Sequence, residues 1–83
     1  MDGMEFINAA IRCLVNYYAE NDLKPEEVTV VWACKTLGNN KALLCTRREN
    51  DDTYYEVTYN GAKGEIYLDC YKKIQNIVYP MKG

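Results

Sequence analysis

The sequence predicts an α+β fold, in which one N-terminal helix packs on an antiparallel meander of three or four strands and a short C-terminal helix or turn follows. Three observations favour it. Apolar residues recur at helical spacing over residues 4–20, the apolar period changes to two from Val28 onward, and turn-forming residues separate the later segments. Because 48% of its 83 residues are apolar, intrinsic disorder is not expected, and residues 1–83 are predicted to form a single small domain.

Residues 4–20 are predicted to form an amphipathic helix. The apolar residues that share one stripe, at positions i, i+4, i+7, i+8 and i+11, are Phe6, Ala10, Cys13, Leu14 and Tyr17. Glu5 suits the positive end of the helix dipole. Asn21 and Asp22 are typical of a helix end, and the polar linker over residues 24–27 contains a proline that cannot easily continue the helix.

The first two strands are predicted over residues 28–35 and 41–47, with a turn over residues 37–40 between them. Alternation places Val28, Val30, Trp32 and Cys34 on one face of the first strand, and Thr29, Val31, Ala33 and Lys35 on the other. In the second strand, Ala42 and Leu44 alternate with Leu43 and Cys45. Because both faces of the first strand are partly apolar, it is expected to be a central strand of the sheet.

The later segments continue the meander. In the third strand, over residues 53–59, Tyr55, Val57 and Tyr59 alternate with Tyr54, Glu56 and Thr58. Residues 65–71 fit a fourth strand, in which Ile66, Leu68 and Cys70 alternate with Tyr67, Asp69 and Tyr71, but Ile66, Cys70, Ile74 and Ile77 are also spaced for a helix. We favour the strand, because the residues are β-formers that follow a compact loop with two glycines. A short helix or turn over residues 72–79, ended by Pro80, would follow.

In the predicted packing, the helix covers one face of the sheet and leaves the other in solvent. The residues expected to meet in this core are Phe6, Leu14 and Tyr17 from the helix, and Trp32, Val57 and either Leu43 or Leu44 from the sheet. Tyrosine side chains suit the open face, since each has an apolar ring and a polar tip.

The four cysteines are predicted to be reduced, buried thiols. They are 21, 11 and 25 residues apart with no C-x-x-C pair, and the chain has no histidine to complete a mixed metal site. A four-thiolate site remains the less favoured alternative. Reduced thiols suit a cytoplasmic protein, and the chain has neither an apolar stretch long enough to span a membrane nor a basic, signal-like N-terminus.

No group of residues predicts catalysis, a metal or a cofactor. Cys34 or Cys45 would need Lys35 or Arg47 to stabilise a thiolate, and alternation places Lys35 on the strand face opposite Cys34. Glu56 and Asp69 are expected on facing strands in solvent, where carboxylates usually take part in cross-strand charge pairs rather than acid–base chemistry. We therefore expect that the protein is not an enzyme.

Charge and aromatic residues predict a binding surface instead. Residues 1–27 carry a net charge of −4 and residues 49–83 carry −2, whereas residues 28–48 carry +4. The candidate contact residues are the cations of this basic hairpin and the outward tyrosines: Lys35, Lys41, Arg47, Arg48, Tyr54, Tyr67 and Tyr71. A protein partner is the favoured interpretation. Single-stranded nucleic acid is the alternative, and an exposed edge strand could pair two copies of the chain.

Four segments also carry a resemblance to a known family. They are the runs at residues 30–37, 40–44, 54–61 and 65–69, which read VVWACKTL, NKALL, YYEVTYNG and EIYLD. Over roughly residues 5–76 the chain resembles an uncharacterised family of small proteins encoded in phages and prophages of Firmicutes. The resemblance implies a viral accessory protein that acts inside a bacterial cell, with no known catalytic residues. By analogy with other small phage proteins, it suggests an inhibitor of a host enzyme or defence system, as in anti-CRISPR proteins.

Overall fold

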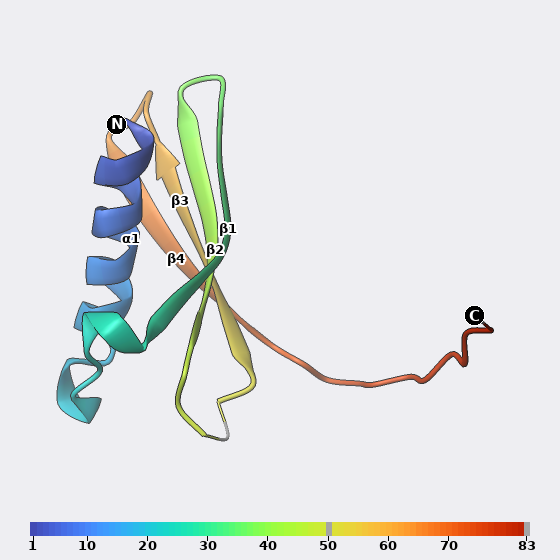
Figure 1. Cartoon of the computed structure of the whole chain (residues 1–83). Coiled ribbons are helices and arrows are strands. Elements are labelled where there is room, and N and C mark those ends of the chain that lie inside the picture. Colours follow the sequence, from blue (N-terminus) through green and yellow to red (C-terminus); the bar gives the residue numbers. More distant parts are fainter. Residues whose placement is uncertain (50, 83) are drawn as a thin grey trace.

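The computed structural model describes residues 1–49 and 51–82 and confirms the predicted architecture (Figure 1). One helix packs on an open, four-stranded antiparallel sheet whose strand order is β1-β2-β3-β4. The elements are α1 (Gly3–Tyr17), the 3-10 turns η1 (Ala19–Asn21) and η2 (Pro25–Glu27), and the strands β1 (Val28–Thr36), β2 (Asn39–Thr46), β3 (Thr53–Asn60) and β4 (Glu65–Lys72). Within the described residues, no helix combines the length and apolar character that crossing a membrane requires.

Helix α1 is held at its start by Asp2, whose carboxylate accepts a hydrogen bond of 2.8 Å from the amide of Glu5. This N-cap satisfies one of the amides that the first turn leaves unpaired. The helix ends three residues earlier than predicted, because Ala19–Asn21 tightens into a 3-10 turn and Asp22 takes a left-handed conformation with φ of 54°.

The core lies between α1 and the middle of the sheet. Its buried apolar residues are Phe6, Ala10, Leu14, Leu23, Val28, Ala42, Leu44, Tyr55 and Val57. The alternation predicted for the second and third strands is confirmed, since Ala42, Leu44, Tyr55 and Val57 all face the helix. Tyr17 was expected in this core but is 59% exposed, because it belongs to the last turn of the helix, where its ring contacts those of Tyr18 and Tyr55.

The face assignment predicted for the first strand is wrong beyond Val30. Val30 pairs with Leu44, but a β-bulge follows, so that Trp32 pairs with Leu43 and Ala33 with Ala42. A bulge adds one residue to a strand and thereby moves every later side chain to the opposite face. Trp32 consequently points away from α1 rather than into the core, and Ala33 and Lys35 lie on the helix side.

Two further expectations need correction. Strand β1 lies at an edge of the sheet rather than in its centre, since it pairs with β2 alone. The apolar residues of its second face lie on an open surface, so they did not indicate a central strand. The fourth strand is confirmed at Glu65–Lys72, but the short helix or turn expected over residues 72–79 does not form. Residues 73–82 instead leave the sheet as an extended tail that runs away from α1 (Figure 1).

Candidate functional site: the outer face of the sheet

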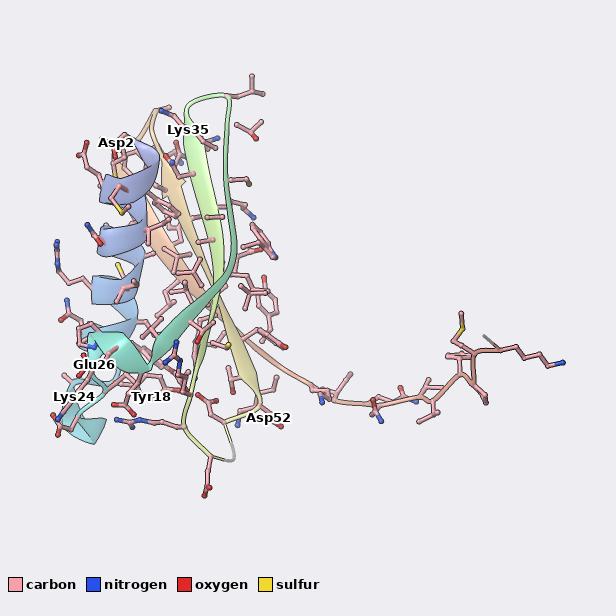
Figure 2. All side chains as sticks on the ribbon, in the orientation of Figure 1. Asp2, Tyr18, Lys24, Glu26, Lys35 and Asp52 are labelled. Carbon is pink, nitrogen blue, oxygen red and sulfur yellow. The ribbon has the colours of Figure 1, made fainter. Side chains whose placement is uncertain are left out.

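The face of the sheet that points away from α1, called the outer face here, carries a patch of aromatic and aliphatic side chains. Its outward residues include Val31, Trp32, Cys34, Lys41, Leu43, Tyr54, Glu56, Tyr67, Asp69 and Tyr71. Figure 2 shows side chains projecting from this side of the sheet, with the tail leading away from them. The tyrosines of the patch are 38% to 53% exposed, and Trp32 is 42% exposed, so no described segment of the chain covers them.

The three outward tyrosines come from β3 and β4. Tyr54 and Tyr71 are direct cross-strand partners, and Tyr67 lies further along β4, opposite Thr58. The phenol of Tyr67 donates a hydrogen bond of 3.2 Å to Glu65, and partial desolvation together with this bond raises its pKa above the ordinary value. Tyr67 therefore presents a neutral phenol, rather than a phenolate charge, on the outer face.

The charged groups of the outer face are close to balanced. Lys41 forms an ion pair of 3.2 Å with Glu56, and Glu56 in turn lies directly opposite Asp69 in the β3–β4 register, as predicted. Asp69 forms no ion pair or hydrogen bond within the described residues. The one cation in the middle of the face is thus already neutralised by a carboxylate, and a second carboxylate lies beside the pair.

The structure divides the predicted contact residues between two sides of the molecule. Lys41, Tyr54, Tyr67 and Tyr71 share the outer face. Arg47 lies at its end, where its Nε donates a hydrogen bond of 3.2 Å to the hydroxyl of Thr29. Lys35, moved by the bulge, lines a cavity of about 270 Å³ beside the start of α1. Arg48 also lies on the helix side, so the basic hairpin does not present its four cations together.

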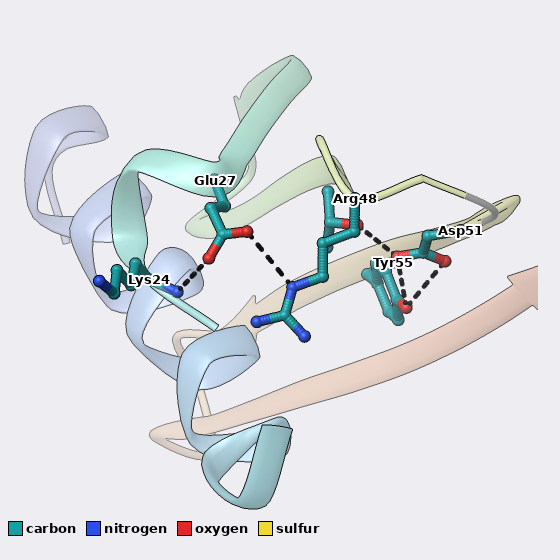
Figure 3. Close-up of polar contacts among 6 residues, drawn as sticks. Lys24, Glu27, Arg48, Asp51 and Tyr55 are labelled. Atoms are coloured by element: carbon teal, nitrogen blue, oxygen red, sulfur yellow. Dashed lines mark hydrogen bonds and ion pairs between the residues drawn. The ribbon is translucent and has the colours of Figure 1, made fainter. Parts of the chain in front are cut away.

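Arg48 has a structural partner. Its guanidinium lies 3.3 Å from the carboxylate of Glu27, which also accepts a hydrogen bond of 3.0 Å from the amide of Lys24 (Figure 3). The bond from the Lys24 amide and the one from Arg48 lower the pKa of Glu27 below its ordinary value. These contacts tie the loop after β2 to η2, which positions the chain as it enters β1.

Asp51 holds the other side of the same loop (Figure 3). Its carboxylate accepts hydrogen bonds from the Thr46 hydroxyl, from the amide of Thr53 at 3.1 Å and from the buried phenol of Tyr55 at 3.3 Å. Burial acts to raise the pKa of Asp51, but these hydrogen bonds together lower it. The phenol of Tyr55 also bonds to that of Tyr18, and its burial and these contacts raise its pKa. Arg48 and Asp51 therefore anchor the described residues of the loop between β2 and β3 to the rest of the fold.

The four cysteines are free, but the prediction that all are buried is wrong. Cys34 and Cys70 are exposed, because they lie on the edge strands β1 and β4, and Cys13 and Cys45 are half-buried. Burial raises the pKa of Cys13, which keeps it a thiol. Cys34 and Lys35 lie on opposite faces of β1, as predicted. Among the residues that the structure describes, no group of three or more carboxylates and thiols is arranged to hold a metal ion.

Sequence reasoning missed the apolar residues that β1 and β2 contribute to the outer face. Val31, Trp32 and Leu43 surround the bulge, which an unbroken apolar run does not reveal. It also missed Leu37, which lies in the turn between β1 and β2, is 96% exposed and has a φ of 52°. Positive φ is uncommon for a leucine and costs stability. A two-residue hairpin turn requires positive φ at its first position, so the sequence Leu37-Gly38 between two strands could have indicated that Leu37 takes this unfavourable conformation.

Comparison with known proteins identifies the family of the chain. No curated protein and no solved structure matches the chain. Residues 7–81 match the model of a protein family of unknown function, DUF6275, and this match spans most of α1, the whole sheet and most of the tail. The chain therefore belongs to the DUF6275 family.

Proposed function

We propose that the protein is a non-enzymatic binding protein whose outer face docks on a host protein. The observation that carries this proposal is the uncovered group of aromatic rings formed by Trp32, Tyr54, Tyr67 and Tyr71 on one face of a small sheet. Monomeric proteins rarely leave large contiguous apolar patches in water, and such patches usually mark interaction sites.

The chemistry of the patch suits a protein partner. Tryptophan and tyrosine are enriched at the centre of protein interfaces, because each buries a large area while losing little conformational entropy. The rings stand on strands rather than on loops, so they are held in place before a partner arrives. The Lys41–Glu56 ion pair and the neighbouring Asp69 supply polar groups at the same surface, as interfaces require for orientation.

The resemblance to small proteins of Firmicute phages and prophages supports a more specific form of the proposal. A phage-derived accessory protein would act in the cytoplasm of the bacterial host, where reduced cysteines are stable. Small phage proteins commonly bind and block host enzymes, so we infer an inhibitor of a bacterial defence system, comparable in role to an anti-CRISPR protein.

The test is affinity capture from a lysogenic or phage-infected host with three versions of the protein. A host protein that is retained by the unaltered chain should be lost with the double variant Trp32→Thr, Tyr71→Ser. It should still be retained by Met4→Thr, which changes an exposed apolar residue on α1, away from the outer face. Retention by all three versions would show that the outer face is not the docking site.

Single-stranded nucleic acid is the second candidate, because Tyr54, Tyr67 and Tyr71 could stack bases beside Lys41. The charges weigh against it: Lys41 is already paired, Glu56 and Asp69 lie beside it, and the chain has a net charge of −2. Phosphate binding needs unpaired cationic surface and weakens steeply with salt. Titration with a labelled oligonucleotide separates the candidates, since no binding at about 50 mM salt removes nucleic acid as the ligand.

A further inference from the structure

The layer that covers the inner face of the sheet, the face toward α1, stops short of β4. Val57 on β3 is fully buried, whereas its register partner Leu68 on β4 is only half-buried. Tyr55 is likewise buried, whereas its partner Cys70 is exposed. A helix about 10 Å across covers roughly two strands spaced about 4.8 Å apart, so one helix cannot cover four. The inner face of β4 is therefore only partly covered: Ile66 and Leu68 pack against the edge of the core but stay half-buried, and Cys70 is exposed.

A groove follows from this unfinished layer. It contains a cavity of about 260 Å³ between α1 and β4, whose lining includes Ala9, Arg12, Cys13, Asn16, Tyr59 and Ile66. Farther toward the end of α1, a hydrogen bond to the thiol of Cys70 raises the pKa of the exposed Tyr17 phenol. The groove is thus bordered by the side of α1 and floored by the inner face of β4, and its lining is largely apolar.

The tail carries apolar side chains that could cover an apolar groove. Residues 73–82 contribute to none of the hydrogen bonds or core contacts of the described chain, and their large apolar side chains are 58% to 96% exposed. These side chains are Ile74, Ile77, Val78, Tyr79 and Met81. Ile74, Ile77 and Val78 are spaced i, i+3 and i+4, so they gather on one side if the segment coils when it docks. Ten extended residues reach up to ~33 Å, which is enough to follow the eight residues of β4.

The charges of the tail also complement the rest of the chain. Lys73 and Lys82 give residues 73–82 a charge of +2 without any acid, while residues 1–72 carry twelve acids and eight bases, a net charge of −4. The tail is therefore attracted to the body of another copy, and the attraction favours encounter between two copies that the net charge of −2 on each chain would otherwise oppose.

The course of the chain favours another copy over the tail's own groove. The tail leaves β4 in the direction away from α1 (Figure 1), whereas the groove lies beside α1. No glycine occurs between Gly64 and Gly83, so the segment lacks the residue that most readily permits a tight reversal. A tail that continues outward meets the groove of a neighbouring molecule without reversing.

We propose that the protein forms a homodimer in which the tail of each copy docks in the groove between α1 and β4 of the other. The exchange is reciprocal, so both grooves are filled and the assembly closes as a two-fold dimer. The tail completes the apolar cover that α1 gives only in part to Ile66, Leu68 and Cys70. The outer face lies on the opposite side of the sheet, so the dimer leaves it free and does not rest on the function proposed above.

The native cysteines provide the test. Cys13 and Cys70 lie at the groove, whereas Cys34 and Cys45 lie on the outer face. In the Ile77→Cys variant, mild oxidation should produce a disulfide-linked species of twice the 9.6 kDa chain mass on a non-reducing gel, beyond any formed by the unaltered chain. The species should disappear when Cys13→Ser and Cys70→Ser are added, and should persist with Cys34→Ser and Cys45→Ser.

Every other result overturns the proposal. A disulfide from Ile77→Cys to Cys13 or Cys70 within one chain would place the tail in its own groove. A linked species that requires Cys34 or Cys45 would place the tail on the outer face. If no new disulfide formed, the tail would not occupy the groove. Light scattering gives an independent measure: Ile77→Asn with Val78→Asn should halve the mass of the unaltered protein, and the polar control Gln75→Ser with Asn76→Ser should not.

Discussion

Replacing Trp32 by threonine tests the bulge and the outer face together. The ring is 42% exposed, so it has lost rather more than half of its accessible surface on folding. Truncating a fully buried tryptophan costs about 3–5 kcal/mol, part of which comes from the cavity left behind. On an open face no closed cavity forms and threonine retains a high strand propensity, so we expect a loss of about 1–2 kcal/mol. For a domain of this size, that corresponds to a fall in Tm of about 5–15 °C.

The measurement is thermal unfolding by circular dichroism, with Leu44→Ala as the matched core variant. Leu44 is fully buried on the inner face, and its truncation should cost about 2–5 kcal/mol. Because Trp32 is the only tryptophan, its fluorescence gives a second readout: the emission of the folded protein should be quenched readily by iodide. A loss as large as that of Leu44→Ala, or emission shielded from iodide, would place Trp32 in the core and refute the bulge.

Three further predictions concern the loops. Asp51→Asn should lower the free energy of unfolding by about 1–2 kcal/mol at pH 7, because it weakens charge-assisted hydrogen bonds from Thr46, Thr53 and Tyr55. Because the pKa of Asp51 is lowered in the folded state from 3.8, the gap between wild type and variant should be complete above that value and should close as the pH falls through the folded pKa, which urea titrations at several pH values would detect. Leu37→Asn should raise the free energy of unfolding by about 1 kcal/mol, since asparagine tolerates positive φ far better than leucine; an unchanged or lower midpoint in urea would contradict this. Gly61→Ala should destabilise the protein measurably while Ala62→Gly changes little, because a Cβ at position 61 would collide with the backbone carbonyl of Gly38; equal Tm values for the two variants would show that the two turns can separate at no cost.

The sequence was sufficient to predict the helix and the inner strands. Helical spacing identified the buried side of α1, with Phe6, Ala10 and Leu14, and strict alternation identified the inward residues of β2 and β3. Alternation failed in β1 because residues 30–34 are all apolar or cysteine, so the pattern carries no signal of where an extra residue enters. The tail was predicted to coil from its spacing, but a short segment forms a helix only when its apolar side is packed, and no surface of its own chain lies against it.

The candidate site could be predicted only in part for the same reason. The tyrosines of β3 and β4 were placed on the open face because their strands alternate without interruption. The cations were grouped because they are close in sequence. Closeness in sequence does not determine on which face of the sheet a side chain lies when a bulge and a loop separate the residues. Arg48 was placed on the helix side by its contact with Glu27, which is 21 residues away in sequence and unrelated to it by any periodic pattern. Such contacts depend on tertiary packing.

The two proposed surfaces lie on opposite sides of one sheet, and this makes them separable by experiment. Trp32 points to the outer face, whereas Ile77 belongs to the tail that we place in the groove beside α1. Sites that share no contacts act additively, while sites that share an interface show coupling. If both proposals hold, Trp32→Thr should weaken host-protein capture without changing the mass of the dimer, and Ile77→Asn should change the mass while each protomer retains its outer face. If instead either substitution abolished both properties, a single surface would serve the two roles, and the outer face would be the site where the tail docks.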